Sequence, residues 1–252
     1  MPGYMNPAEF ANIAGCEADF WWYRGMREIF FRFLDPYLQR RPIARALEAG
    51  CGTGYFSGLL QAARGWPIIP VDISWEGLSH ARRMGVQRPV QTDICLLPFA
   101  PASFDLVISV DVLPHLPPGA ERQAAAEFAR VLAPGGLLVI RAAALRILRS
   151  RHSAFALERQ RFTRRRIAGM AESAGFRVLR CTYINSLLLP VALAKFRLWE
   201  PLLRRPAASG LQPVSRWLNR LLYAPLALES RWIGAGHGFP AGQSLLLLGE
   251  KL

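Results

Sequence analysis

The sequence has few cysteines, and the four that it contains lie far apart. Cys16, Cys51, Cys95 and Cys181 form neither a C-x-x-C pair nor a cysteine and histidine group with the spacing of metal ligands. We therefore expect reduced, buried thiols in a cytoplasmic protein, and no bound metal.

The chain also lacks a long uncharged apolar run, which would need roughly 20 residues to cross a bilayer. The nearest candidate, INSLLLPVALAKFRLWEPLL, is interrupted by Pro190 and then by Lys195, Arg197 and Glu200. At the N-terminus no basic segment precedes an apolar core and a cleavage site, so we expect no secretion signal. The pattern argues against a membrane span but is compatible with a segment that lies on a membrane.

Acidic residues are scarce: 18 aspartates and glutamates stand against 31 lysines and arginines, which gives a formal net charge of +13. A positive field raises the encounter rate with any polyanion, so the partner could be nucleic acid, anionic lipid or an acidic substrate. The alternative is that the composition is simply rich in arginine and has no such partner. A hydrophobic share of 52% with 19% charged residues indicates an ordered globular chain, long enough to bury a sizeable core.

Strand and helix patterns alternate along most of the chain. An amphipathic helix with an aromatic face is predicted over residues 20–38, ended by Asp35 and Pro36. Predicted strands follow at 43–50, 66–72, 88–93, 104–110, 137–143, 176–185 and 242–252, with predicted helices at 53–64, 76–85, 120–132 and 163–175. This alternation predicts an α/β fold, a doubly wound, mostly parallel, seven-stranded sheet with helices on both faces.

The stretch LEAGCGTGYFSGLL, residues 47–60, places three alternating glycines between a predicted strand and a predicted helix. A dinucleotide loop has the pattern G-x-G-x-x-G, whose glycines allow close approach to a pyrophosphate. Counted from either of the first two glycines, the third position falls on Tyr55 or Ser57, so this pattern fails. Glu48 would repel a phosphate here, whereas it would attract a ligand that carries positive charge.

Acidic side chains also stand at the ends of the next two predicted strands, where open α/β sheets bind their ligands. Asp72, in PVDIS, can accept hydrogen bonds from both hydroxyls of a ribose. Asp93, in QTDI, lies beside apolar Ile94 and can accept the amino group of an adenine that packs on the aliphatic side chains. Together these residues predict an adenosine site without a phosphate cradle.

The motifs EAGCGTG, VDIS, TDICLLPF, FDLVISVDVLPHL and RVLAPGG follow one another over residues 45–143. In this order and spacing the chain resembles the class I, Rossmann-like S-adenosylmethionine-dependent methyltransferases, in the small-molecule branch of types 11 and 25. FWWYRGMREI and RFTRRRIAGMAESAGF, outside that region, resemble one bacterial subgroup. The resemblance implies methyl transfer from S-adenosylmethionine, leaving S-adenosylhomocysteine, to an oxygen, nitrogen or carbon nucleophile of a small or lipid- or saccharide-linked molecule.

The resemblance also implies which residues hold this cofactor, which presents an ammonium, a carboxylate and a sulfonium instead of phosphates. Gly50, Cys51 and Gly52 would lie along its methionine part, and Asp72 would bind its ribose. Arg24 could pair with its carboxylate through a bidentate fork. The predicted cofactor-binding residues are Tyr23, Arg24, Glu48, Gly50, Cys51, Gly52, Asp72, Ile73, Asp93, Ile94 and Val110.

Several of these assignments have plainer alternatives. Aspartates favour helix caps and turns, which would account for Asp72 and Asp93. The alternative for Arg24 is a side chain that is exposed to solvent and binds no ligand. At least two of the three aromatic residues at 21–23 are expected to belong to the core.

His115 is the candidate catalytic residue, because the unperturbed pKa of histidine suits removal of a proton from a hydroxyl or amine near neutrality. It follows the fourth predicted strand, near the expected methyl group, and a structural role is its alternative. The family usually has an acid before this histidine, whereas Pro114 stands here. The tetrapeptide D/N-P-P-Y/F of many methyltransferases that act on base or amide nitrogens is absent, so a nucleic-acid acceptor is not expected.

One methyltransferase domain is expected over residues 1–252, because the final strand needs the sheet as its partner. It divides into a helical cap (1–42), a cofactor-binding core (43–184), a helical insertion (185–242) and the final strand (243–252). The segment 187–205 is expected to cover the acceptor pocket and to touch anionic membrane, with a helix packed on the sheet as the alternative.

Two other functions stay open on the sequence alone. Asp72 and the glycines also fit, weakly, an NAD-dependent oxidoreductase. The apolar insertion fits a non-catalytic, membrane-peripheral protein that binds a nucleoside. The arginine runs at 164–166 and 204–205 are interpreted as a solvated helix face and a loop, or as contacts to lipid or phosphate groups. No pattern determines the oligomeric state.

Overall fold

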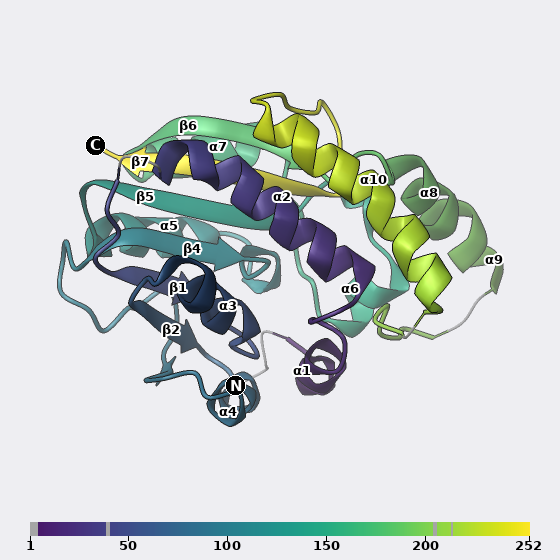
Figure 1. Cartoon of the computed structure of the whole chain (residues 1–252), viewed down its shortest axis with the longest axis horizontal. Helices are drawn as coiled ribbons and strands as arrows, with labels where there is room; N and C mark the ends of the chain where they lie inside the picture. Colours follow the sequence, from purple (N-terminus) through teal and green to yellow (C-terminus); the bar gives the residue numbers. More distant parts are fainter. Residues whose placement is uncertain (1–4, 39–40, 204–205, 213) are drawn as a thin grey trace.

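The computed structural model describes residues 5–38, 41–203, 206–212 and 214–252, and the arginine run at 204–205 falls outside them. Its centre is one sheet with helices on both faces (Figure 1). The strand order is β3-β2-β1-β4-β5-β7-β6. The strands are β1 (Ala46–Ala49), β2 (Ile68–Asp72), β3 (Val90–Gln91), β4 (Phe104–Val110), β5 (Leu132–Ala143), β6 (Phe176–Ile184) and β7 (Ser244–Lys251).

Strands β1 to β5 pair in parallel, and β7 runs antiparallel to both of its neighbours, β5 and β6. The predicted doubly wound, mostly parallel, seven-stranded sheet is thus confirmed in the described residues. The last strand of the chain lies between the two strands that precede it in sequence, so it completes the sheet from inside and not at an edge. The segment between β6 and β7 therefore has to bring the chain back to the middle of this half of the sheet.

Alternate side chains of the central strands enter two separate cores, as the period of a β-strand requires. On β4, Val107 packs with the helices α5 and α7, whereas Leu106 and Ile108 pack with α2, α3 and α10. The helices are α1 (Pro7–Ala14), α2 (Trp21–Leu38), α3 (Tyr55–Arg64), α4 (Trp75–Arg83), α5 (Ala120–Val131), α6 (Arg151–Phe155), α7 (Arg164–Ser173), α8 (Leu189–Ala194), α9 (Glu200–Leu203) and α10 (Arg216–Gly234), with short turns η1 (Leu113–His115), η2 (Arg146–Leu148) and the π-helical η3 (Lys195–Trp199).

Two boundaries differ from the expected ones. Helix α2 does not end at Asp35 and Pro36 but continues to Leu38, because its buried face packs in the core and outweighs the one hydrogen bond that a proline cannot donate. Strand β5 begins at Leu132, five residues before the expected strand, since Leu132 pairs with Phe104 across a register irregularity between β4 and β5.

Two short helices were not predicted. Helix α1 begins after Asn6, whose side chain accepts a hydrogen bond from the Ala8 amide, and has Pro7 at its first position. Helix α6 begins after Ser150, which forms a reciprocal cap with Ser153. Both caps are visible in the sequence, but each helix is too short to show a clear apolar period.

The insertion is helical, as predicted, and α10 lies alongside α2 (Figure 1). The two helices approach closely because position 25 is glycine: a Cβ there would lie 2.3 Å from Cδ1 of Leu226. The fully buried Glu229 of α10 accepts hydrogen bonds from the amides of Ser186 (2.8 Å) and Leu187 (3.2 Å). These contacts hold both the long helix and the start of the insertion against the sheet layer.

Candidate functional site

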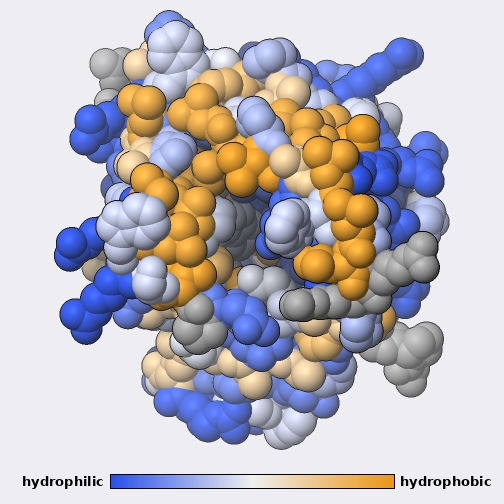
Figure 2. Space-filling model, turned by 90° about the vertical axis from the view of Figure 1, so that its right-hand side faces the viewer, coloured by the Kyte–Doolittle hydropathy of each residue, from blue (hydrophilic) through white to orange (hydrophobic). Residues whose placement is uncertain are grey.

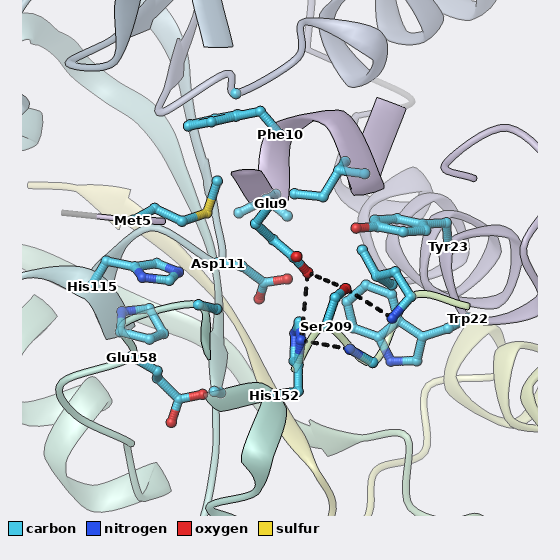
Figure 3. A pocket seen from close by; sticks show the side chains of 18 of the residues that line it. Met5, Glu9, Phe10, Trp22, Tyr23, Asp111, His115, His152, Glu158 and Ser209 are labelled. Carbon is cyan, nitrogen blue, oxygen red and sulfur yellow. Dashed lines mark hydrogen bonds and ion pairs between the residues drawn. The ribbon is translucent and has the colours of Figure 1, made fainter. Parts of the chain in front are cut away.

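A large cavity of about 1180 Å³ opens at the carboxyl ends of β1, β2, β4 and β5. Parallel strands bring their carboxyl ends to one edge, where open α/β sheets form a crevice. The walls come from α1, α2, α6 and the insertion, which close over this edge. Figure 3 shows the aromatic pair Trp22 and Tyr23 on one side of the cavity and His115 and Met5 on the other.

The glycine-rich turn after β1 forms one end of the cavity. The amides of Gly50 and Cys51 both donate to the Val71 carbonyl at 2.8 Å, which ties the turn to β2. Gly50 has a φ of +90°, and a Cβ at this position would lie 2.1 Å from Cγ2 of Val112 in the loop after β4. Only glycine therefore allows the two loops to meet.

Asp72, at the end of β2, fixes the same turn. Its Oδ2 accepts the Gly52 amide and its Oδ1 accepts the Ser74 amide, both at 2.8 Å. Burial raises the pKa of its carboxyl, and these backbone hydrogen bonds oppose the rise. Asp72 thus has the turn-forming role that was the plainer alternative, and it also lines the cavity. Each carboxylate oxygen has a second acceptor site, so binding of ribose hydroxyls stays a prediction.

Glu48 places a second carboxyl at this end. It is 2% exposed, its Oε2 accepts the Ser57 hydroxyl, and burial raises its pKa to about 8, with Asp72 and Glu17 contributing repulsion. Glu17 is itself buried, and its Oε2 accepts the Thr53 hydroxyl at 2.7 Å. Glu48 and Asp72 line the cavity here, and acids beside a glycine turn fit a ligand with a cationic group better than they fit a phosphate. We refer to this as the glycine-turn end of the cavity.

The structure brings most of the predicted site residues together. The cavity is lined by Tyr23, Glu48, Gly50, Cys51, Gly52, Asp72, Ile73, Val110 and His115. His115 lies half-buried in η1, held by a hydrogen bond from its amide to the Val112 carbonyl at 2.9 Å. Its catalytic role stays a prediction.

Three predicted residues are not among the described residues that line this cavity. The Arg24 guanidinium lies over the ring of Tyr223 in α10, 4.4 Å from its centroid, so it does not reach toward the glycine turn. Ile94 belongs to the hydrophobic core, and Asp93 accepts the Cys95 amide at 2.8 Å in the turn after β3. Their adenine-binding role therefore stays a prediction without support from the shape of the cavity.

An ion pair that the sequence reasoning missed lies across the ends of β4 and β5. Arg141 is 6% exposed, its guanidinium pairs with Asp111, and its Cζ lies 4.9 Å from the centroid of the Trp22 ring. Asp111 has a φ of +59°, a conformation that is uncommon for a residue with a side chain. The sequence marks only the arginine, which stands alone in the apolar stretch LLVIRAA, and gives no sign of its partner.

The cap end of the cavity joins three segments that are remote in sequence. Buried Glu9 of α1 accepts the Ser209 hydroxyl at 3.0 Å, and its Oε1 lies 3.4 Å from Nδ1 of His152 in α6 (Figure 3). The Gly210 amide donates to the same Nδ1 at 3.1 Å, so the neutral imidazole carries its proton on Nε2. Burial lowers the pKa of His152, in accord with a neutral ring.

In the part of the chain that the structure describes, there is no group of three or more histidine, cysteine, aspartate or glutamate side chains that could hold a metal ion. The polar groups of the cavity include acids at both ends, the ion pair of Arg141 with Asp111, and basic side chains such as Lys195. This arrangement can bind a cationic group at one end and a second, largely apolar molecule beside it.

Comparison with known proteins agrees with this geometry. A protein-family model described as "Methyltransferase domain" matches residues 47–140. The chain is 35% identical over 123 residues to a malonyl-[acyl-carrier protein] O-methyltransferase of Enterobacter lignolyticus, covering 46% of this chain and 47% of that one. It is 32% identical over 129 residues to a "Probable S-adenosylmethionine-dependent methyltransferase" of Mycobacterium tuberculosis, covering 51% and 44%.

The whole fold has solved counterparts. A SAM dependent methyltransferase from Archaeoglobus fulgidus superposes with a TM-score of 0.58 at 18% identity, over 90% of this chain and 94% of that one. At this identity the likeness concerns the fold. The chain spans about half the length of the curated relatives it matches. The region that the family model matches carries the glycine turn and the carboxyl ends of β1 to β4.

Proposed function

We propose that this chain, which belongs to the class I S-adenosylmethionine-dependent methyltransferases, methylates an oxygen, nitrogen or carbon nucleophile of a small or lipid- or saccharide-linked molecule. The observation that carries the proposal is one cavity with an acid-lined glycine turn at one end and room for a second molecule. At about 1180 Å³ it exceeds the roughly 300–1,000 Å³ of ordinary ligand pockets.

The glycine-turn end is the proposed cofactor site. The turn at Gly50 and Gly52 offers backbone beside which a methionine chain can lie, and Glu48 would attract its ammonium. Asp72 would accept the ribose hydroxyls with the acceptor sites that Gly52 and Ser74 leave open. S-adenosylmethionine, when bound there, supplies a methyl group that its sulfonium already activates for nucleophilic attack.

The protein's own part in such a reaction is to position the acceptor and to exclude water. Apolar side chains of Phe10, Trp22, Phe196 and Leu222 line the rest of the cavity and suit the carbon skeleton of an acceptor. His115, at the end of β4, is proposed to take the proton of the acceptor or to orient it.

Two measurements test the proposal in turn. Calorimetric titration should show that the protein binds S-adenosylhomocysteine much more tightly than NADH, because acids stand where a pyrophosphate would need donors. Comparable binding of NADH would favour the oxidoreductase alternative instead.

The acceptor class is then sought with methyl-labelled S-adenosylmethionine and a host-cell extract, fractionated into lipid, saccharide, nucleic-acid and small-molecule pools. Label in the lipid, saccharide or small-molecule pool is the expected result. Label in nucleic acid alone would overturn the proposed acceptor class, and cofactor binding without label in any pool would favour a non-catalytic binding protein.

A further inference from the structure

Helix α10 is apolar on two opposite sides. Leu226 and Ile233 are buried against α2, next to the buried polar pair Glu229 and Ser230. The exposed large side chains are Trp217, Leu221, Leu228 and Trp232, and Trp217 is 71% exposed. Their spacing of 4, 7 and 4 residues puts all four on one stripe of the helix, about half a turn away from the buried side. A surface helix needs one apolar side to pack on the core, and that side of α10 is the one against α2. At the end of the second stripe Trp232 stacks on the ring of His237, with 4.1 Å between the centroids, and it is still half exposed.

The preceding helices of the insertion continue this exposed surface. Val191 of α8, Leu198 and Trp199 of η3, and Leu202 of α9 are all exposed, Leu202 to 79%. Figure 2, which views the molecule from the side where α8, α9 and α10 lie in Figure 1, shows apolar side chains arranged around a hollow. We define the apolar face as Val191, Leu198, Trp199, Leu202, Trp217, Leu221, Leu228 and Trp232. Large apolar side chains that gather on one exposed side of a molecule mark an interaction site.

The charges on the same segments are basic. On α10, Arg216, Arg220 and Arg231 each directly precede a residue of the exposed stripe, so they flank it along one side. Lys195 and Arg197 are exposed on η3. The acids of these segments are engaged elsewhere: Glu229 is fully buried, and Glu200 accepts the Arg151 amide at 2.9 Å. The apolar face is therefore bordered by cations.

We propose that the apolar face docks on the surface of an anionic lipid bilayer. Tryptophan and leucine side chains enter the interface between headgroups and acyl chains, while flanking arginines and lysines meet the lipid phosphates. The net charge of +13 supports the same partner, because it draws the whole molecule toward a negative surface. No helix in the described part of the chain is long and apolar enough to cross a bilayer, so the helices would lie in its plane.

Docking at this place would present the cavity to the membrane. Lys195 and Phe196 of η3 and Leu222 of α10 line the cavity, so the segments that carry the apolar face are also its walls. An amphiphile with a polar, nucleophilic head and an acyl or prenyl tail could then enter without leaving the lipid phase. This part of the inference, the lipid-borne acceptor, rests on the proposed function; the docking itself does not.

The test is co-sedimentation of the full chain with vesicles, without cofactor or acceptor. Vesicles of phosphatidylcholine and phosphatidylglycerol in equal parts are compared with vesicles of phosphatidylcholine alone. We expect binding to the anionic vesicles to be stronger by about tenfold or more and to weaken as salt is raised. Equally poor binding to both kinds of vesicle would overturn the proposal.

Matched variants separate the apolar and the charged contributions. Trp217→Ser with Leu221→Ser, and separately Arg216→Gln with Arg220→Gln, should each reduce anionic-vesicle binding by about tenfold. Their controls are exposed residues away from the face, namely Met84→Ser with Leu252→Ser and Arg83→Gln with Arg122→Gln, which should bind like the wild type. Circular dichroism confirms that each variant is folded.

Other occupants of the face give different results. A dimer in analytical ultracentrifugation that dissociates in the Trp217→Ser and Leu221→Ser variant, with vesicle binding unchanged, would assign the face to a second copy and overturn the proposal. Vesicle binding by a protein that methylates nothing would leave the docking intact and refute the proposed function. Methylation of a water-soluble acceptor without vesicle binding would support the proposed function and refute the docking.

Discussion

The two ends of the cavity are built in different ways. At the glycine-turn end, Gly52 and Asp72 are 20 residues apart, and their hydrogen bond joins the ends of two adjacent parallel strands. At the cap end, Glu9 and Ser209 are 200 residues apart and join the N-terminal helix to the insertion. The first end depends mainly on adjacent strands of the sheet, with Glu17 added from the segment between α1 and α2. The second depends on helices that fold over the finished sheet. If the proposed function holds, we expect the first end to set cofactor affinity and the second to set acceptor specificity.

The largest effect is expected at His115, which lines the cavity from η1. His115→Ala should lower kcat by about 10²–10⁴, the usual contribution of a general base, with little change in the affinity for S-adenosylhomocysteine. Asp72→Ala is the converse variant, because it removes the acceptor of the Gly52 amide and should weaken cofactor binding first. Steady-state kinetics with an identified acceptor and calorimetry separate the two effects. Near-normal kcat in His115→Ala would return this histidine to a structural role.

A large loss of stability is expected from a side chain in the glycine turn. Gly50→Ala should lower the free energy of unfolding by roughly 2–5 kcal/mol, because its Cβ would collide with Val112 and the backbone has a positive φ. Gly58→Ala in α3 is the matched control, since a Cβ there meets nothing within 4 Å. It should raise stability by up to about 1 kcal/mol through helix propensity. Urea unfolding measures both, and equal effects would contradict the close contact between the two loops.

The Glu48 carboxyl gives the glycine-turn end a dependence on pH. Its pKa of about 8 in the folded protein lies above its ordinary value, so the folded state keeps a proton that the unfolded chain has lost. As the pH rises from the ordinary glutamate pKa to about 8, the free energy of unfolding should fall by up to about 1.4 kcal/mol per pH unit. An ammonium binds the ionised carboxylate better, so affinity for S-adenosylhomocysteine should rise with pH up to about 8.

Glu48→Gln should flatten both pH profiles, whereas Glu172→Gln, at an exposed glutamate of α7, should leave them unchanged. Calorimetry in buffers of different ionisation enthalpy counts the protons released on binding. If the wild type releases no proton at pH 7, the carboxyl does not ionise against the ligand, and its contact with the ammonium would be refuted.

The smallest effect is expected at the cap end. Ser209→Ala removes one hydrogen bond to Glu9, worth about 0.5–1.5 kcal/mol, and should raise the acceptor KM by roughly 2–10-fold. The affinity for S-adenosylhomocysteine should not change, because the glycine-turn end is built separately. Ser103→Ala, which removes a comparable hydroxyl hydrogen bond in a turn outside the cavity, is the control. A change in cofactor affinity without a change in KM would contradict the division of the cavity into two ends.

Sequence reasoning predicted the glycine-turn end better than the cap end. Gly50, Glu48 and Asp72 were identified because each stands at a strand end, and strand ends meet at one edge of a parallel sheet. Arg24 was expected near the cofactor, but its guanidinium lies over Tyr223, a contact across almost 200 residues that α10 creates. Arg141 was missed because an arginine inside an apolar strand gives no sign of its partner until β4 and β5 are paired.

The sequence by itself determined the order of strands and helices, the acid-bearing glycine turn and the family, because these depend on local periods and on residues at fixed short spacings. Only the tertiary structure decided that β7 lies between β5 and β6, that α10 packs on α2, and that Glu9, His152 and Ser209 meet. Such contacts join segments separated by a folded sheet, so no local pattern encodes them. Likewise, only the structure shows which of the two apolar sides of α10 is buried and which is exposed.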